Sequence, residues 1–137
     1  MSEALPNRKL GPLRDLRNDE LAIIKKMLAM IPFASKLVTQ LTALKVQDMP
    51  DGGMGSIKFY NGQPRSELEY GKAIAEAAFR DADGMPVSLS LSVDKVGELF
   101  ELDVFKADGS PLVRYPDLDQ VEMIERHGQL GLPPVKP

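Results

Sequence analysis

Two acidic residues, Glu101 and Asp103, are two positions apart in a segment where polar and apolar residues alternate. Successive side chains of a strand point to opposite faces, so this spacing predicts both carboxylates on one face, about 7 Å apart along the strand. Two carboxylates at that separation can serve as acid and base in hydrolysis or bind a hard cation. Alternatively, they belong to a solvated sheet face flanked by Lys95 and Lys106.

Two apolar residues are expected on the same strand face. The spacing places Leu99 and Phe105 beside Glu101 and Asp103. Apolar and acidic groups side by side are typical of a surface that binds another protein. We therefore predict that these four residues form a partner-binding face and that the partner is a protein with basic groups.

Other site chemistry has little support in the sequence. The chain has no cysteine, which excludes thiolate metal sites and cysteine nucleophiles. It has a single histidine, His127. Ser56 and Ser110 lie beside turns, but no Gly-x-Ser-x-Gly elbow is present. The glycines of 52–55 lack the Gly-Lys-Ser/Thr ending of a phosphate loop, and the acids of 81–84 lack the later ligands of a calcium loop. We predict no catalytic residue, no cofactor and no metal.

Charge is distributed unevenly along the chain. The net charge is −3, with +4 in residues 1–47 and −7 in the remainder. An acidic surface repels phosphate backbones, so we predict that the protein does not bind nucleic acid. The N-terminus lacks the pattern of a secretory signal, and no apolar run approaches the ~20 residues that span a bilayer. We predict a cytoplasmic protein that does not associate with membranes.

Apolar residues recur every three or four positions in two segments before Lys45. The first segment begins at Asn18, a good helix cap, and is stopped by Pro32, and the second begins at Ser35. This pattern predicts two short helices that bury their apolar faces against another element. Those faces consist of Leu21, Ile24, Leu28 and Ile31 in the first helix and of Leu37 or Val38, Leu41 and Leu44 in the second.

From Lys45 onward the hydrophobic period changes to two, which predicts strands separated by Gly, Pro and Asp turns. Residues 66–81 fit either a helix or a strand, and we favour a strand over 71–81 because its neighbours look like meander partners. The strands are then expected at 45–49, 55–60, 71–81, 87–93 and 99–105. These segments predict an antiparallel meander of four to six strands.

The C-terminal part predicts one more element. Asp117 is a candidate cap, and the apolar residues that follow it predict a short helix over 118–127, with a short strand as the alternative. The fold class is therefore α+β, with an N-terminal helical pair packed on one face of the meander. We expect a single domain over 1–137, with an ordered core of about 15–127 and with tails at 1–14 and 129–137.

Three strings in the sequence carry a family resemblance. They are GGMGS at 52–56, DADGMPVS at 81–88 and GELFELD at 97–103, and the last is followed by a K-x-D-x-SPL string at 106–112. On these strings the chain resembles a family of small bacterial proteins known only as a domain of unknown function. The resemblance covers about residues 15–115, and Phe105 stands at a position where the family has an aromatic residue. It implies a compact bacterial cytoplasmic domain with an acid-rich hairpin and no assigned catalytic residues.

These observations predict a non-catalytic protein-interaction domain that binds its partner through the acidic hairpin face. The size and the acidic bias are also similar to those of bacterial immunity proteins, which suggests an immunity or regulatory role. One alternative is a small-ligand binder with a pocket between the sheet and the helices. A carboxylate-dependent hydrolase that uses Glu101, Asp103 or His127 is a weaker alternative.

Overall fold

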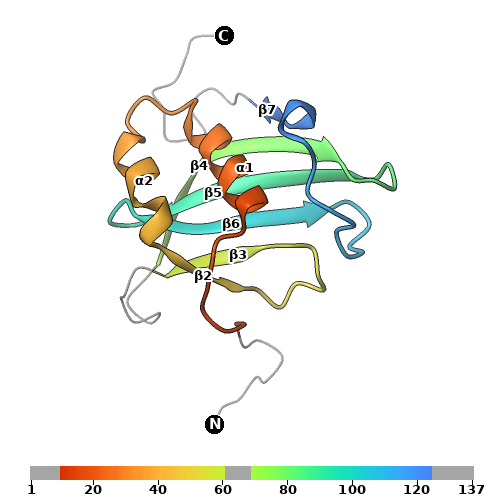
Figure 1. Cartoon of the computed structure of the whole chain (residues 1–137), viewed down its shortest axis with the longest axis horizontal. Helices are drawn as coiled ribbons and strands as arrows, with labels where there is room; N and C mark the ends of the chain where they lie inside the picture. Colours follow the sequence, from red (N-terminus) through yellow and green to blue (C-terminus); the bar gives the residue numbers. More distant parts are fainter. Residues whose placement is uncertain (1–9, 61–68, 125–137) are drawn as a thin grey trace.

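A computed structural model describes residues 10–60 and 69–124. These residues form an α+β fold in which two short helices lie on one face of a single antiparallel sheet (Figure 1). The helices are α1 (Asn18–Leu28) and α2 (Ser35–Gln40), with 3-10 turns η2 (Leu41–Ala43) and η4 (Leu118–Gln120). The strands are β1 (Arg14–Asp15), β2 (Lys45–Asp48), β3 (Ile57–Tyr60), β4 (Tyr70–Arg80), β5 (Pro86–Asp94), β6 (Leu99–Lys106) and β7 (Glu122–Ile124).

The described sheet contains seven strands in the order β1-β2-β3-β6-β5-β4-β7. The expected hairpin β2–β3 and the expected meander β4–β5–β6 are both present, and β3 joins them by pairing with β6. The prediction of four to six strands is too low because β1 and β7 have only two and three residues. Such short edge strands carry almost no periodic signal, since period two needs several residues to become visible.

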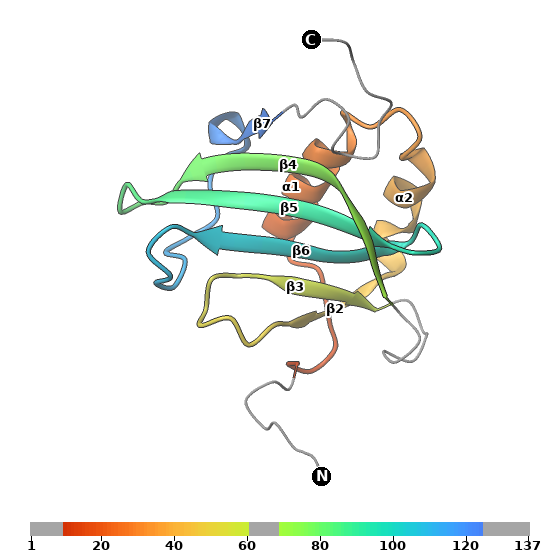
Figure 2. The same ribbon diagram turned by 180° about the vertical axis from the view of Figure 1, so that it is seen from behind.

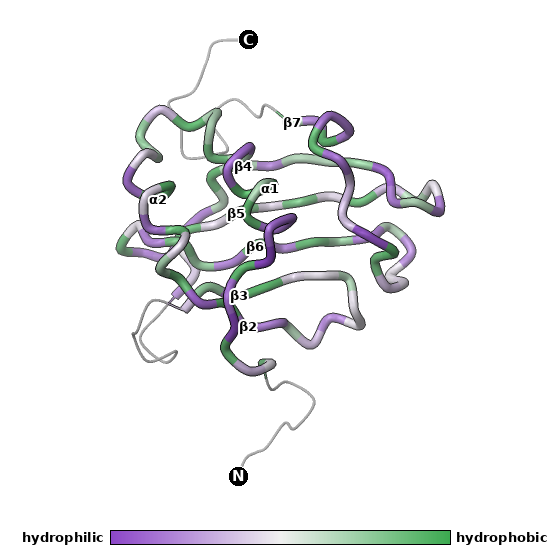
Figure 3. The backbone as a smooth tube through the Cα atoms, viewed as in Figure 1, coloured by the Kyte–Doolittle hydropathy of each residue, from purple (hydrophilic) through white to green (hydrophobic). Residues whose placement is uncertain are grey.

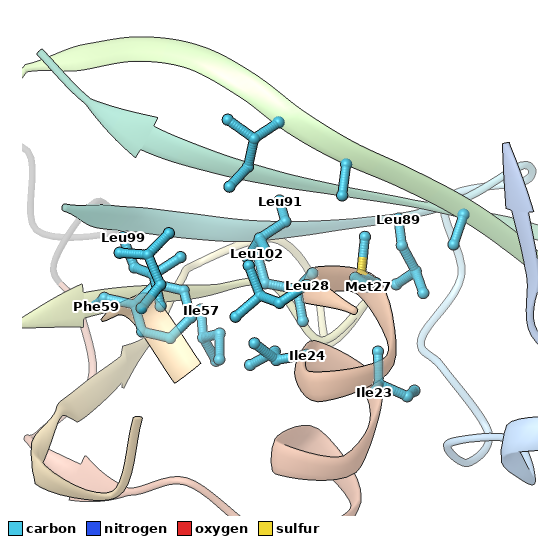
Figure 4. Close-up of a cluster of buried hydrophobic side chains, with 14 of the residues drawn as sticks. Ile23, Ile24, Met27, Leu28, Ile57, Phe59, Leu89, Leu91, Leu99 and Leu102 are labelled. Atoms are coloured by element: carbon cyan, nitrogen blue, oxygen red, sulfur yellow. The ribbon is translucent and has the colours of Figure 1, made fainter. Parts of the chain in front are cut away.

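The two helices share the cover of the sheet unequally. Figures 1 and 2 show α1 lying across the central strands, with α2 beside it near the strand ends, and the opposite sheet face turned away from both. α1 buries Ile23, Ile24, Met27 and Leu28 against the apolar side chains of the sheet (Figure 4). The predicted helical pair is therefore present, but only α1 spans the centre of the sheet.

The core forms because the strand period and the helix period each present one apolar face. In β5, Val87, Leu89, Leu91 and Val93 are at most 6% exposed and belong to the core cluster. Hydrophobic and hydrophilic residues alternate along the central strands in Figure 3. The serines between the apolar residues of β5 face the opposite side of the sheet, as period two requires.

The segment with ambiguous periodicity is a strand. β4 spans Tyr70–Arg80 and pairs with β5 on one side and with β7 on the other, which confirms the interpretation that we favoured for 71–81. Its register shifts twice, once between Tyr70 and Lys72 and once between Ala73 and Ala75. Figure 2 shows that β4 bends strongly near its start. A β-carbon at Gly71 would lie 2.6 Å from the carbonyl oxygen of Asp94, so only glycine permits this close approach.

The predicted C-terminal helix over 118–127 is wrong for the described part. Residues Leu118–Gln120 form a single 3-10 turn, and Glu122–Ile124 form β7, which confirms the alternative of a short strand. The free edge of β4 offers backbone hydrogen bonds to this segment, whereas an isolated helix of ten residues is marginal in water. Residues 125–127 lie outside the described residues.

The start of α1 differs by one residue from the prediction. Arg17 occupies the cap position and Asn18 is the first helical residue. The backbone N–H of Arg17 donates to the carboxylate of Glu20 at 2.8 Å. Residues 11–14, expected in a tail, lie along β2, because the Gly11 N–H donates to the Asp48 carbonyl and Arg14 pairs with Val46.

Candidate functional site

Leu99 lies in the core and not on the outer face where the alternation places it. It is 4% exposed and pairs with Val93, which belongs to the same hydrophobic core cluster. The register of β5 and β6 shifts between Ser92 and Val93, because Ser92 pairs with Glu101 whereas Val93 pairs with Leu99, so β6 contains one extra residue at this point. This β-bulge moves every residue before it to the other face, which is the physical reason for the wrong placement.

Phe100 takes a place on the outer face that the sequence analysis assigned to its neighbour. The ammonium group of Lys58 lies 4.2 Å from the centre of the Phe100 ring. The ring of Tyr70 meets Phe100 edge to face, with 6.1 Å between ring centres. Lys58 also forms a 2.6 Å ion pair with Glu101, whose side chain is 18% exposed. The predicted acidic face therefore has its Glu101 charge already paired.

Asp103 is the exposed acid of this face. Its carboxylate accepts a hydrogen bond of 3.3 Å from the hydroxyl of Ser56. Partial desolvation of the carboxyl group raises the pKa of Asp103, and the nearby carboxylates of Glu101 and Asp51 raise it further, although the Ser56 hydrogen bond opposes them. No described lysine or arginine forms an ion pair with Asp103, so its charge is available to a ligand.

Asp103 borders a hollow of about 220 Å³ on the outer face. Its outer-face lining also includes Glu76, Ser88, Ser90 and Ile124. Ser90 pairs with Asp103 on one side and with Glu76 on the other, so the two acids lie two strands apart, with about 10 Å between backbones. We call this site the Asp103 hollow. It combines two carboxylates with a floor of serine hydroxyls.

Phe105 follows Asp103 by two positions in β6 and therefore lies on the same sheet face, although it does not line the Asp103 hollow. It is 51% exposed and pairs with Ser88 across β5. No described helix covers this face of the sheet (Figure 2). Of the four residues predicted to form the partner-binding face, Glu101, Asp103 and Phe105 therefore lie on the open face, and Leu99 does not.

A second group of charged residues was missed by the sequence analysis. Lys106, expected beside a solvated face, is 1% exposed and its ammonium group lies 2.8 Å from Asp81 and 2.6 Å from Asp83. It also donates to the carbonyl of Pro111 at 3.1 Å. Alternation along β6 could have revealed this burial, because Lys106 continues the inward-facing series of Leu102 and Val104.

The motif strings meet around this buried lysine at one end of the sheet. Asp81 accepts hydrogen bonds from the backbone N–H groups of Val113 and Arg114, at 2.7 and 3.3 Å. The Leu112 N–H donates to the Gly53 carbonyl at 3.0 Å. Residues distant in sequence are thereby fixed to each other. The strings consequently have a structural role, which is to hold the segment after β6 against the glycine-rich hairpin.

Asp51 organises the glycine-rich hairpin itself. Its carboxylate accepts hydrogen bonds from the backbone N–H groups of Gly53, Met54 and Ser56, at 3.2, 3.1 and 2.9 Å. Gly52, Gly53 and Gly55 have positive φ angles, which other residues rarely adopt. These hydrogen bonds and backbone angles give the hairpin loop a defined conformation. The loop borders a cavity on the α1 side of the sheet.

Two further classes of site can be assessed from the same residues. Within residues 10–60 and 69–124, no group of three or more acidic or histidine side chains is placed to hold a metal ion. His127 lies outside the described residues. None of the helices in the described ranges is both long and apolar enough to cross a membrane.

A profile for a domain of unknown function (DUF6984) matches residues 13–116. The chain belongs to the DUF6984 family. The match includes the three motif strings, the Lys106 ion pairs and the whole lining of the cavity beside the hairpin. The Asp103 hollow also takes Ile124 from outside the DUF6984 match. No curated protein and no solved structure matches the chain significantly.

Proposed function

We propose that this DUF6984 protein is a non-catalytic protein-binding domain whose open sheet face receives a basic side chain of its partner in the Asp103 hollow. One observation carries this proposal. The exposed Phe105 ring and the Asp103 carboxylate lie next to each other on a sheet face that no described helix covers. An apolar ring beside a charge is a typical anchor of a protein interface.

The chemistry of the Asp103 hollow favours a lysine or arginine of the partner. Asp103 forms no described ion pair, and Glu76 lies across Ser90 from it. A guanidinium or ammonium group can donate to the carboxylates and to the serine hydroxyls at the same time. Such complementary charges increase the association rate and select the partner.

Phe105 supports a macromolecular partner over a small ion. Aromatic residues are enriched among the side chains that dominate binding energy in protein interfaces. A half-exposed ring on an otherwise polar sheet face gains most when a partner covers it, because its apolar area is then removed from water. The setting that we propose is an immunity or regulatory role in a bacterial cytoplasm, which the small size and the family resemblance support.

The hydrolase alternative has less support than binding. The Glu101 carboxylate forms a 2.6 Å ion pair with Lys58, so it is already engaged by the protein. Asp103 accepts a hydrogen bond from Ser56 and forms none with another described acid or base. The pair Glu101 and Asp103 is therefore better suited to binding than to acid and base chemistry.

The test is a capture experiment followed by an affinity measurement. The full chain is immobilised and incubated with lysate of the source cell at low and at moderate salt, and the retained protein is identified and purified. We expect a single stoichiometric partner whose affinity falls at least tenfold for Asp103→Asn and for Phe105→Ala.

Two control variants match these changes on other surfaces. Asp119→Asn removes an exposed acid within η4, and Phe33→Ala removes a ring that is 55% exposed between the helices. Both controls should bind as the wild type does. The proposal is overturned if the captured partner binds the Asp103 and Phe105 variants with wild-type affinity, or if the folded protein retains no partner at either salt concentration.

A further inference from the structure

A cavity of about 360 Å³ lies on the α1 side of the sheet, where three segments meet. They are the start of α1, the glycine-rich hairpin and residues 112–115. This volume lies within the range of small-molecule sites, roughly 300–1,000 Å³. The cavity shares no lining residue with the Asp103 hollow. A ligand here would therefore be distinct from the proposed protein partner.

The acidic groups in the cavity wall are already engaged by the protein. Asp19 is paired with Arg17 at 3.1 Å, and Asp48 is paired with Arg14 at 2.8 Å. Asp51 accepts three backbone N–H groups of the hairpin. A cation entering the cavity would have to compete with these contacts, so the carboxylates do not make it a cation site.

The hydroxyl of Tyr115 is a polar group of the wall that lacks a partner. It is buried, and no described atom forms a hydrogen bond with it. Burial raises the pKa of Tyr115 well above its usual range, so the hydroxyl keeps its proton and can donate. A β-carbon at Gly55 would lie 3.9 Å from the hydroxyl, and the absence of a side chain there leaves space beside it. The Arg17 guanidinium, which also belongs to a residue of the cavity wall, lies 5.2 Å from the centre of the Tyr115 ring.

Arg114 is the other unused group of the wall. Its backbone N–H is bound to Asp81, which fixes the residue at the rim, but its guanidinium forms no ion pair or hydrogen bond with any described residue. Arg114 also borders a neighbouring hollow of about 290 Å³ together with Arg80, whose guanidinium donates to the Gly84 carbonyl. Arg114 therefore brings to the rim one positive charge with which no described acid forms an ion pair.

We propose that this cavity binds a small anionic molecule, whose carboxylate or phosphate pairs with Arg114 and whose acceptor atom takes the hydrogen bond of the Tyr115 hydroxyl. Guanidinium groups bind both kinds of anion in a bidentate manner. The bound molecule satisfies the hydroxyl that the protein leaves without a partner. Gly55, which lines the cavity, carries no side chain that would fill the space beside the Tyr115 hydroxyl.

The test uses inorganic phosphate and succinate as probes. The ¹⁵N-labelled full chain is titrated with each anion at millimolar concentrations and constant ionic strength, with chloride as the reference. We expect saturable shifts of the backbone amides of Gly53, Gly55 and Tyr115 for at least one probe. A response to phosphate alone indicates a phosphate ester as the ligand, and a response to succinate alone indicates a carboxylate.

Two variants test whether the Arg114 guanidinium and the Tyr115 hydroxyl bind the anion. Arg114→Gln should lower the affinity for the anion that binds at least tenfold. Lys25→Gln, which removes an exposed charge on α1, should leave that affinity unchanged. Tyr115→Phe should weaken binding severalfold and raise the melting temperature of the unliganded protein, because it removes a buried hydroxyl without a partner. The proposal is overturned if neither probe gives a saturable response, if Arg114→Gln binds as the wild type does, or if Tyr115→Phe lowers the melting temperature without changing affinity.

Discussion

The ammonium group of Lys106 lies 2.8 Å from the carboxylate of Asp81, and the two side chains are 1% and 0% exposed. A buried charge of this kind is tolerated only when it is paired and hydrogen-bonded. Lys106 meets this condition through Asp81, Asp83 and the Pro111 carbonyl. The pair thereby fixes the β4–β5 turn and the segment after β6 at the same end of the sheet.

Replacing Lys106 by methionine should strongly destabilise the fold. Methionine can fill the space of the lysine stem, but the Asp81 carboxylate would stay buried without its counter-ion. Removing one partner of a buried ion pair costs about 3–5 kcal/mol, and we expect a loss in this range for Lys106→Met. Urea unfolding measures the free energy directly.

The matched control for this prediction is Lys25→Met, which makes the same change at an exposed position of α1. It should alter the free energy of unfolding by less than about 0.5 kcal/mol. A loss below about 1 kcal/mol for Lys106→Met would mean that Asp81 does not need its counter-ion.

Asp81 should make the stability of the protein depend on acid pH. Burial alone would raise the pKa of Asp81, but hydrogen bonds from Lys106 and from the backbone of Val113, Ala82 and Arg114 outweigh it and lower the pKa to about 2. The unfolded chain titrates near 3.8. Because the folded pKa lies below the unfolded one, the carboxylate stabilises the fold fully above about pH 4, and this contribution is lost as the pH falls towards 2.

The measurement is the free energy of unfolding between about pH 2 and pH 5, for the wild type and for Asp81→Asn. The variant cannot ionise at this position, so its stability should change less steeply below about pH 4. Asp119→Asn, which removes an exposed acid, should keep the wild-type slope. Parallel curves for the wild type and Asp81→Asn would contradict the prediction.

The β-bulge at Phe100 predicts that alanine substitutions at two residues of the same strand lower the free energy of unfolding by very different amounts. Leu99 is 4% exposed and packs in the core, so Leu99→Ala should lower the free energy of unfolding by about 2–5 kcal/mol. Phe105 is 51% exposed on the open face, and Phe105→Ala should cost less than about 1 kcal/mol. Denaturant unfolding of the two variants under identical conditions tests this difference. Equal losses, or a larger loss for Phe105→Ala, would show that β6 lacks the bulge.

The sequence by itself determined the elements that have a long and regular pattern. The alternation of Val87, Leu89, Leu91 and Val93 with serines predicts β5 and its buried face, and the structure confirms both. The spacing of apolar residues after Asn18 predicts α1 in the same way. In such segments all the apolar residues lie on one buried face, so the local periodicity is sufficient to predict the element and its buried side.

Only the tertiary structure decided where the pattern is interrupted and which distant side chains meet. The inward position of Leu99 depends on the register with β5, a relation between strands that the order of residues in β6 does not contain. β7 is a strand because the edge of β4 offers backbone hydrogen bonds to it. The Asp103 hollow requires residues from four strands, and the burial of Lys106 requires residues from three separate segments. Long-range pairing sets these contacts, and a one-residue change of register would move the side chains to the opposite face.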